Sequence, residues 1–217
     1  TFFANMGNSI SRREFIQNAL RRKRPVEITT ARCAKLSNLS KLGYRGLAYT
    51  ALINPNLSQF ADGNLQRAAS QGHEVGLHGG KNHGSWLSHG ANWSTERLRE
   101  EIEFGLRQLQ QYCSTKVRSF SSPGWQGSGN LHHVLDELGI EVVADAHGHD
   151  LKTVSRVGKS GHLKSVPTNI LGEPGGVGYI EHMDAIGLDE SMALKKFQSD
   201  LEEAGDLAVV YDHPYYA

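Results

Sequence analysis

The stretch at residues 72–86, "GHEVGLHGGKNHGSW", places two histidines directly after a short apolar run. Residues 74–77 ("EVGL") are typical of a strand bounded by glycine. His78 follows at once, and His83 comes five residues later in a segment rich in glycine. Imidazoles at the exit of a strand can bind a metal ion, or they can lie in an ordinary exposed loop. The sequence on either side distinguishes these two interpretations.

Helix and strand patterns alternate on both sides of this stretch. Helical spacing of apolar residues predicts three helices, at residues 94–112, 131–139 and 189–205. Ser94 is a suitable N-cap for the first, and glycines end the other two. A shorter helix is predicted at residues 64–72, and strands are predicted at residues 117–120, 140–145 and 207–211. Strands separated by helices pair in parallel, so the pattern predicts one α/β domain over residues 1–217.

The first third of the chain is less regular. Residues 10–23 favour a helix, and residues 44–55 favour a strand or a loop. The chain starts at "TFFANMG", within a strand pattern, and stops soon after another strand pattern. We therefore expect a fragment that lacks the first strand and the C-terminal end of its domain.

Composition excludes several classes of function. The 217 residues carry 23 basic and 23 acidic side chains, so no overall field favours nucleic acid or an anionic surface. Cys33 and Cys113 form no metal-binding or disulfide pattern, which favours a reducing compartment. Because the sequence shows neither a membrane-spanning run nor a signal peptide, we expect a cytoplasmic protein and leave contact with the inner face of the membrane open.

Polar or aromatic residues follow each predicted strand at its C-terminal end, where parallel β/α folds build their active sites. They are His78, residues 121–125 ("SSPGW"), Asp145 with His147, residues 167–169 ("PTN"), and Asp212 with His213. Each also has an ordinary interpretation as a loop or packing residue. Trp86, Trp93 and Trp125 could equally stack on a sugar or pack in the core. Residues 172–178 lack the pattern of a phosphate-binding loop and favour a tight loop beside a substrate.

The order of these motifs resembles the polysaccharide deacetylase (NodB-homology) family. The matching segments are "TFFANMG", "GHEVGLHGGKNHGSW", "SSPGW", "VVADAHG" and "AVVYDHPYY", which together span nearly the whole chain. "HEVGLH", and a "GW" loop without arginine, are most similar to the branch that deformylates a lipid-linked formamido-arabinose. The resemblance implies a distorted, incomplete parallel β/α barrel. It also implies metal-dependent removal of a formyl or acetyl group from an amino sugar, with zinc as the usual metal.

The resemblance also implies roles for particular residues. His78 matches the family's first metal-binding histidine, His213 matches its late catalytic histidine, and Asp145 matches the acidic residue of its fourth motif. The aspartates that serve the family as metal ligand and base are expected upstream of Thr1. We expect substrate contacts from Trp125, Pro123, Thr168 and Tyr215.

The second metal ligand departs from the family pattern. The family spaces its two histidines four residues apart, whereas here Asn82 stands at that position and His83 follows it. On one helix, a step of five residues turns a side chain about 140° away, against about 40° for four. A glycine-rich loop can still bring the two rings together. We expect His83 to be the second ligand, with Asn82 and His89 as alternatives.

Two functions remain open at this point. The first is a metal-dependent hydrolase that acts on an amino-sugar glycan or a lipid-linked sugar, without nucleic acid and with an undetermined oligomeric state. The alternative is a carbohydrate-binding descendant of the same fold that has lost catalysis. The altered histidine spacing favours the alternative, and the intact "DHPYY" at residues 212–216 favours the enzyme.

Overall fold

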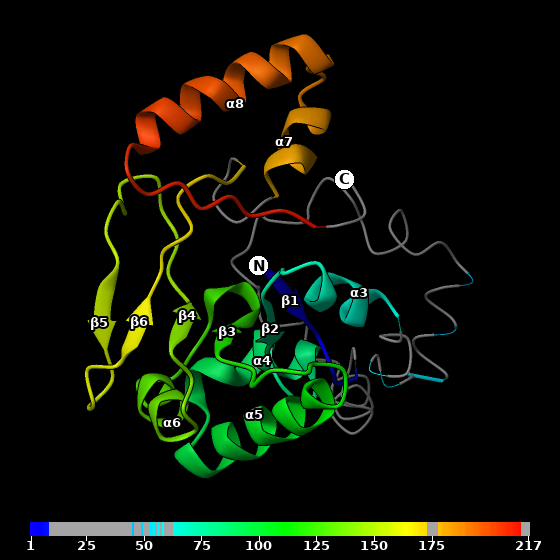
Figure 1. Ribbon diagram of the computed structural model, residues 1–217, viewed down its shortest axis with the longest axis vertical. Helices are drawn as coiled ribbons and strands as arrows, with labels where there is room; N and C mark the ends of the chain where they lie inside the picture. The colour runs from blue at the N-terminus through cyan, green and yellow to red at the C-terminus, as the bar shows by residue number, and fades with distance from the viewer. Residues whose placement is uncertain are drawn as a thin grey trace, which may run out of the picture.

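The computed structural model describes residues 1–8, 63–172 and 178–213, together with six single positions earlier in the chain (Figure 1). Those six are Arg45, Tyr49, Ile53, Asn54, Asn56 and Ser58. The helix predicted at residues 10–23, the loop at residues 173–177 and Tyr215 lie outside the described residues.

A six-stranded sheet in the order β1-β2-β3-β4-β6-β5 forms the centre of the fold. Its strands are β1 (Phe2–Ala4), β2 (Val75–His78), β3 (Ser119–Ser121), β4 (Val142–Ala144), β5 (Ser155–Val157) and β6 (Leu163–Ser165). Neighbouring strands are parallel from β1 to β6, and only β5 is antiparallel, on the outer edge of β6. The prediction of an α/β fold with a mainly parallel sheet is confirmed, although the β5–β6 hairpin was not predicted.

Helices connect these strands as the sequence pattern indicates. They are α3 (Asn64–Ser70), α4 (His83–His89), α5 (Thr95–Gln110), α6 (Leu131–Glu137), α7 (Tyr179–Ala185) and α8 (Glu190–Ala204), with 3-10 turns η3 (Gly90–Asn92) and η4 (Pro123–Trp125). The Ser94 hydroxyl accepts a hydrogen bond from Arg97 N at 3.3 Å, which confirms the predicted N-cap of α5. Gly139 and Gly205 adopt positive φ where α6 and α8 end, as expected of helix-stopping glycines.

Two clusters of buried hydrophobic residues pack the helices against the sheet and against one another. The larger one joins the sheet to α5 and α6, and includes Leu77, Trp86, Ile102 and Phe120, all fully buried. The smaller one joins α7 and α8 around Tyr179, and Figure 1 shows these two helices at the opposite end of the molecule from α5 and α6.

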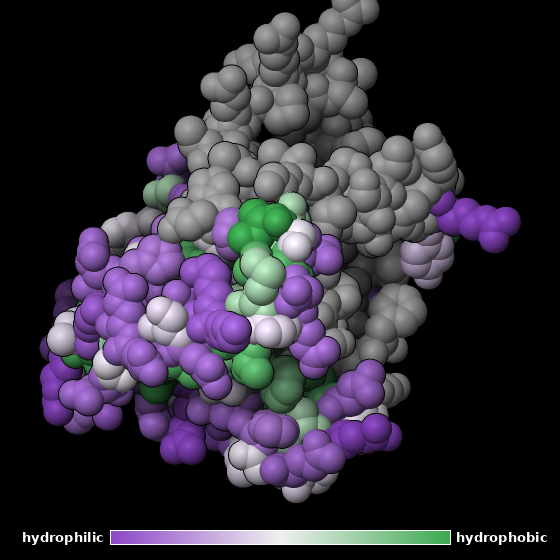
Figure 2. Space-filling model, turned by 90° about the horizontal axis from the view of Figure 1, so that it is seen from above, coloured by the Kyte–Doolittle hydropathy of each residue, from purple (hydrophilic) through white to green (hydrophobic). Residues whose placement is uncertain are grey.

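Figure 2 shows a mainly hydrophilic surface among the described residues, interrupted by a narrow apolar strip. Large exposed apolar side chains in this part of the chain include Ile180 on α7, Ile186 just after it, and Met192, Leu194 and Leu201 on α8. No helix among the described residues combines the length and apolar character needed to cross a bilayer.

Three predictions of secondary structure need correction. Residues 83–89 form helix α4 instead of a loop, because Trp86 anchors this segment in the core. The strand predicted at residues 207–211 is reduced to one bridge between Val210 and Ile170. Backbone hydrogen bonds still join Ile170 to Val209 and Tyr211, whereas residues 207–209 are bound by the Asn169 side chain, which contacts Leu207 O at 2.7 Å and Val209 N at 2.8 Å. Within residues 44–55, predicted as strand or loop, Arg45 and Tyr49 are helical.

The described strands form an open sheet, with isolated parallel bridges beyond β6. These bridges join His147 to Thr168 and Ile170 to Val210. They extend the parallel arrangement toward residues 211–213, and closure into a barrel stays a prediction.

Candidate metal and catalytic site

Two imidazoles converge at the C-terminal end of β2. His78, the last residue of β2, places its Nε2 atom 3.1 Å from Nε2 of His83, the first residue of α4. The other ring nitrogen of His78, Nδ1, lies 2.7 Å from the hydroxyl of Ser121 at the end of β3. A ligand histidine is commonly held in this way through its second nitrogen. His78 is thus oriented by Ser121 and faces His83.

The turn between β2 and α4 produces this convergence. Gly79 has φ +75°, and a Cβ atom there would lie 2.7 Å from Cγ of Pro123, so the position favours glycine twice over. The backbone N–H of Asn82 donates to the buried carboxylate of Glu101 at 3.0 Å. The backbone N–H of His83 donates to Asn8 O at 3.1 Å. The β2–α4 turn is therefore fixed by contacts with three other segments of the chain.

Both histidines are neutral at physiological pH. Burial, followed by the charge of His83 and more weakly of His213, lowers the pKa of His78 to about 3. Burial, followed by the charge of His213, lowers the pKa of His83 to about 4. Neutral imidazole is the form that binds metal, so the electrostatics fit the predicted role.

The spacing of the two nitrogens also fits a metal ion. Two nitrogens each about 2.0–2.1 Å from a tetrahedral zinc are separated by roughly 3.3 Å. The pair in this structure is 3.1 Å apart. Among the described residues no group of three or more histidine, cysteine or acidic side chains could hold a metal. The pair thus supplies two ligands of the usual three.

His83 is the candidate that the structure brings to His78. No hydrogen bond within the described part of the chain joins Asn82 or His89 to His78, and Asn82 is bound to Glu101 instead. His89 is the last residue of α4, six positions beyond His83 and so about 120° around the helix. His78 belongs to β2 and only His83 belongs to α4. The two rings are therefore not five residues apart on one helix, and the turn of about 140° that such a step would impose does not separate them.

His213 stands beside this pair, near enough for its charge to lower the pKa of both His78 and His83. Its Nε2 lies 2.9 Å from the Tyr211 hydroxyl, and its Nδ1 lies 3.6 Å from Oε2 of Glu181 on α7. Its backbone N–H donates to Asp212 Oδ1 at 2.7 Å. Glu181 and Tyr211 were not predicted as site residues, because only the fold brings α7 to this segment.

Asp145 follows β4 and is occupied by two other side chains. Its Oδ2 accepts a hydrogen bond from Nε2 of His132 on α6, and its Oδ1 accepts one from the Ser165 hydroxyl at 2.9 Å. Burial alone would raise the pKa of Asp145, but the hydrogen bond and charge of His132 outweigh it and hold the pKa below its ordinary value. The same hydrogen bond raises the pKa of His132. No local pattern indicates this pair, since its members belong to different elements.

Trp125 lies at the end of a tight turn after β3. Its backbone N–H donates to Ser122 O at 2.9 Å, with Gly124 at φ 60°, ψ 25°, and Trp125 itself has φ 55°, which is uncommon for a bulky residue. Its ring stacks on His147 at 4.5 Å between centroids and meets the edge of Tyr211 at 4.9 Å. This strained turn brings Trp125 within ring contact of the Tyr211–His213 segment.

The remaining predicted contact residues are less exposed. Pro123 and Thr168 are buried in this structure. Trp86 is fully buried and donates to Gln126 O at 2.7 Å, which makes it a core residue, and Trp93 packs against it.

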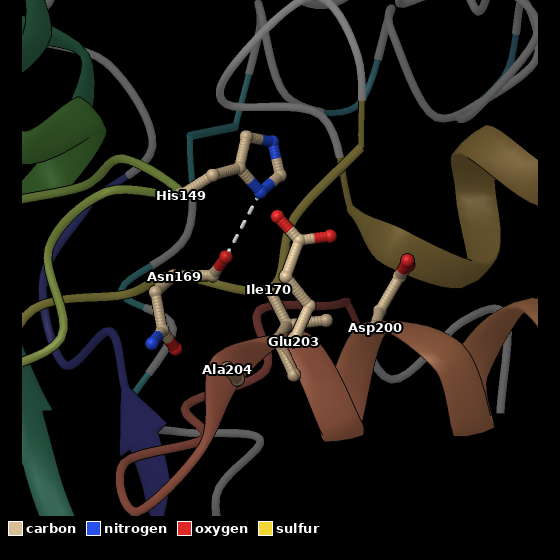
Figure 3. Close-up of a pocket in the computed structure, with 6 residues that line it drawn as sticks. All are labelled: His149, Asn169, Ile170, Asp200, Glu203 and Ala204. Atoms are coloured by element: carbon tan, nitrogen blue, oxygen red, sulfur yellow. Dashed lines mark hydrogen bonds between the residues drawn. The ribbon is translucent and has the colours of Figure 1, made fainter.

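A separate small pocket lies between the loop after β4 and helix α8 (Figure 3). His149, Asn169, Ile170, Asp200, Glu203 and Ala204 line it. His149 Nδ1 donates to Asn169 O at 3.0 Å, which shows that Nδ1 carries the hydrogen. None of the predicted site residues lines this pocket.

Comparison with known protein families identifies the family of this chain. The polysaccharide deacetylase family matches residues 34–143, just over half of the sequence. The chain belongs to the polysaccharide deacetylase family. This confirms the family-level resemblance of the sequence motifs, and the deformylase branch stays a prediction.

Two solved structures are similar to this member of the family. A putative polysaccharide deacetylase from Mycobacterium smegmatis shares 17% identity at a TM-score of 0.46, over 75% of this chain and 65% of its own. A GH57-type branching enzyme from the archaeon Pyrococcus horikoshii shares 14% identity at a TM-score of 0.38, over 73% of this chain and 31% of its own. The chain thus spans less than two thirds of the length of either protein.

Proposed function

We propose that the protein is a metal-dependent hydrolase that removes a formyl or acetyl group from the nitrogen of an amino sugar. The observation that carries the proposal is the His78–His83 pair, with facing Nε2 atoms 3.1 Å apart beside His213. Membership of the polysaccharide deacetylase family supports the choice of substrate class. Zinc is the metal that best suits two neutral imidazoles and a carboxylate.

His78 and His83 would hold the ion through Nε2, with an aspartate upstream of Thr1 as the third ligand. When bound, such an ion polarises a carbonyl group and makes water a stronger nucleophile. Ser121 fixes the ring of His78 through Nδ1, so the ligand nitrogen is already oriented. The burial that keeps both rings neutral also keeps their lone pairs available.

His213 is the proposed general acid. It lies near enough to the histidine pair for its charge to lower the pKa of both rings, and an imidazolium there can give its proton to the leaving amine. Asp145 is proposed to support the site from the end of β4, held in its ionised form by His132. Trp125, Pro123, Thr168 and Tyr215 remain the proposed substrate contacts.

The finer identity of the substrate rests on the sequence motifs. "HEVGLH" and the "GW" turn support a formylated, lipid-linked sugar, and with it a cytoplasmic location at the inner face of the membrane. A second candidate function is carbohydrate binding without catalysis. The observation that favours it is that Asn82 stands where the family has its second metal-binding histidine, which changes the histidine spacing from four residues to five.

The deciding experiment is an assay of the full-length protein with N-formyl and N-acetyl amino sugars, with zinc content measured on the same sample. We expect turnover that His213→Ala reduces by roughly 10² to 10⁴, the usual range for a lost general acid, with zinc content unchanged. Near-normal turnover in His213→Ala would remove this residue from the mechanism. Sugar binding without any turnover in the wild type would favour the second candidate.

A further inference from the structure

We propose that Glu181, on α7, is the carboxylate that positions His213 for proton transfer, and that Asp145 does not serve in this role. The proposal rests on the proposed function, because His213 must first be the general acid. Glu181 would act through His213, as a positioning residue.

The two nitrogens of His213 face different partners. Nδ1 lies 3.6 Å from Glu181 Oε2, within ion-pair distance, and Nε2 lies 2.9 Å from the Tyr211 hydroxyl. At 3.6 Å the contact is an ion pair and not a hydrogen bond, and the negative carboxylate favours a hydrogen on the nitrogen that faces it, Nδ1. Nε2 is then the nitrogen that gains and loses the proton, and the Tyr211 hydroxyl can donate to neutral Nε2 or accept from protonated Nε2.

The backbone holds α7 against the segment that carries His213. Tyr179 N donates to Tyr211 O at 2.9 Å, and Ile180 N donates to Asp212 Oδ2 at 2.5 Å. The other carboxylate oxygen of Asp212 accepts from His213 N at 2.7 Å. Asp212 thus binds both segments and fixes the next residue of α7, Glu181, opposite the ring of His213.

Close packing reinforces this register. A Cβ atom on Gly178 would lie 2.6 Å from Asp212 Oδ1, so a larger residue would push α7 away from the segment. Glu181 itself is only 5% exposed. A buried carboxylate is costly unless an opposite charge or hydrogen bonds compensate it. The imidazolium form of His213 offers that compensation.

Asp145 forms its side-chain hydrogen bonds with residues other than His213. Both of its oxygens are taken by His132 and Ser165, at the end of β4. Glu181 therefore has the geometry for positioning His213, whereas the contacts of Asp145 serve α6 and β6.

A double-mutant cycle tests the proposal in the full-length, metal-loaded protein. We expect Glu181→Gln, which keeps the shape of the side chain, to lower kcat about 10- to 100-fold with little change in KM. Loss of a residue that orients a functional histidine has an effect of this size. In a His213→Ala background the same change should lower kcat no further. The matched control, Glu190→Gln on the exposed first turn of α8, should leave kcat unchanged.

The same cycle with Asp145→Asn separates the two carboxylates. We expect any effect of Asp145→Asn to persist in the His213→Ala background, since it does not act through that ring. If instead Asp145→Asn loses its effect there and Glu181→Gln keeps its own, the proposal is overturned.

A second measurement does not depend on turnover. Nitrogen-15 NMR of the histidine rings, assigned with His213→Ala, reports which nitrogen of His213 carries the hydrogen. We expect the Nδ1–H form in the wild type and loss of that preference in Glu181→Gln. An unchanged preference would overturn the proposal, while absent turnover with the expected NMR result would reject only the proposed hydrolase function.

Discussion

At the scale of the residue, the pairing of His78 with His83 depends on what each ring does with its other contacts. Ser121 takes Nδ1 of His78, so only Nε2 is directed at His83. Burial is the largest cause of the lowered pKa of both rings. The proposed metal site rests on this pair of partly buried, neutral imidazoles with facing nitrogens.

The first prediction compares the two candidate second ligands. His83→Ala should weaken zinc binding by about 100-fold or more. Loss of a residue that only hydrogen-bonds a metal ligand already lowers metal affinity about 10- to 100-fold, and loss of the ligand itself should cost at least as much. His89→Ala is the matched control on the same helix and should leave the affinity within about twofold of wild type. Zinc titration of both variants of the full-length protein measures this. The reverse order of effects would assign the ligand to His89.

The second prediction concerns pH and the His132–Asp145 ion pair. The pKa of His132 is raised above 6.5, so its contribution to stability is complete below about pH 6.5 and is lost as the pH rises through the higher, folded-state value. The pKa of Asp145 is lowered below 3.8, so its contribution is present above about pH 3.8 and is lost as the pH falls further. The pair should therefore stabilise the fold most near pH 5.

We expect His132→Gln to lower the free energy of unfolding by about 0.5–1 kcal/mol near pH 5, a small value because the His132 side chain is partly exposed. The loss should shrink toward pH 9. Urea unfolding at several pH values measures it. An equal loss at all pH values would show that the ion pair contributes nothing.

At the scale of the element, the turn between β2 and α4 is the critical piece. It reverses the chain within four residues, and Gly79 makes this feasible by adopting φ +75° against Pro123. The turn also packs closely against the backbone of Gly7, because a Cβ atom on Gly7 would lie 2.2 Å from Lys81 O. Glycine at these positions sets the separation of the two imidazoles.

The third prediction tests this turn with a matched pair of glycines. Gly79 and Gly72 both have positive φ, but an added Cβ meets Pro123 at Gly79 and nothing within 4 Å at Gly72. Gly72→Ala should cost only the backbone strain, about 1–2 kcal/mol. Gly79→Ala should cost about 1–3 kcal/mol more through overpacking, and should also weaken zinc binding. Urea unfolding and zinc titration of both variants decide it, and equal effects would argue against a packed turn.

At the scale of the whole molecule, Trp86 joins the elements that carry the site. It belongs to α4, its ring contacts Phe120 of β3 and Trp93, and its Nε1 donates to Gln126 O just after η4. The two segments that follow β2 and β3 are thus held together from within the core. The site depends on this packing because its histidines lie at the edge of it.

The fourth prediction follows from that position. Trp86→Ala should lower the free energy of unfolding by about 3–5 kcal/mol, as expected for a large buried aromatic residue. Trp93→Ala should cost clearly less, because Trp93 is only partly buried. Trp86→Phe keeps most of the volume and provides a folded intermediate case. Denaturant unfolding of the three variants measures the order, and an equal cost for Trp93→Ala would contradict it.

Local sequence alone determined most of the elements. Apolar spacing and the Ser94 cap specify α5, and glycine stops end α6 and α8, because these signals act within a few residues. Local signals failed at residues 83–89, where Trp86 draws a glycine-rich segment into the core as a helix. They were only partly right at residues 207–211, where backbone pairing is limited to the segment beside Ile170 and the side chain of Asn169 binds residues 207 and 209.

The site divides in the same way. The sequence predicts His78, His83 and His213 as site residues, because strand ends and motif order can be recognised along the chain. The tertiary structure alone decided that His83 faces His78, that Asp145 pairs with His132, and that Glu181 stands opposite His213. These contacts join residues on different elements, and only packing of the helices on the sheet brings such residues together. The physical reason for this division is the separation along the chain over which each interaction acts. Helix capping and apolar periodicity involve residues a few positions apart, whereas charge pairing and burial involve residues from distant parts of the chain.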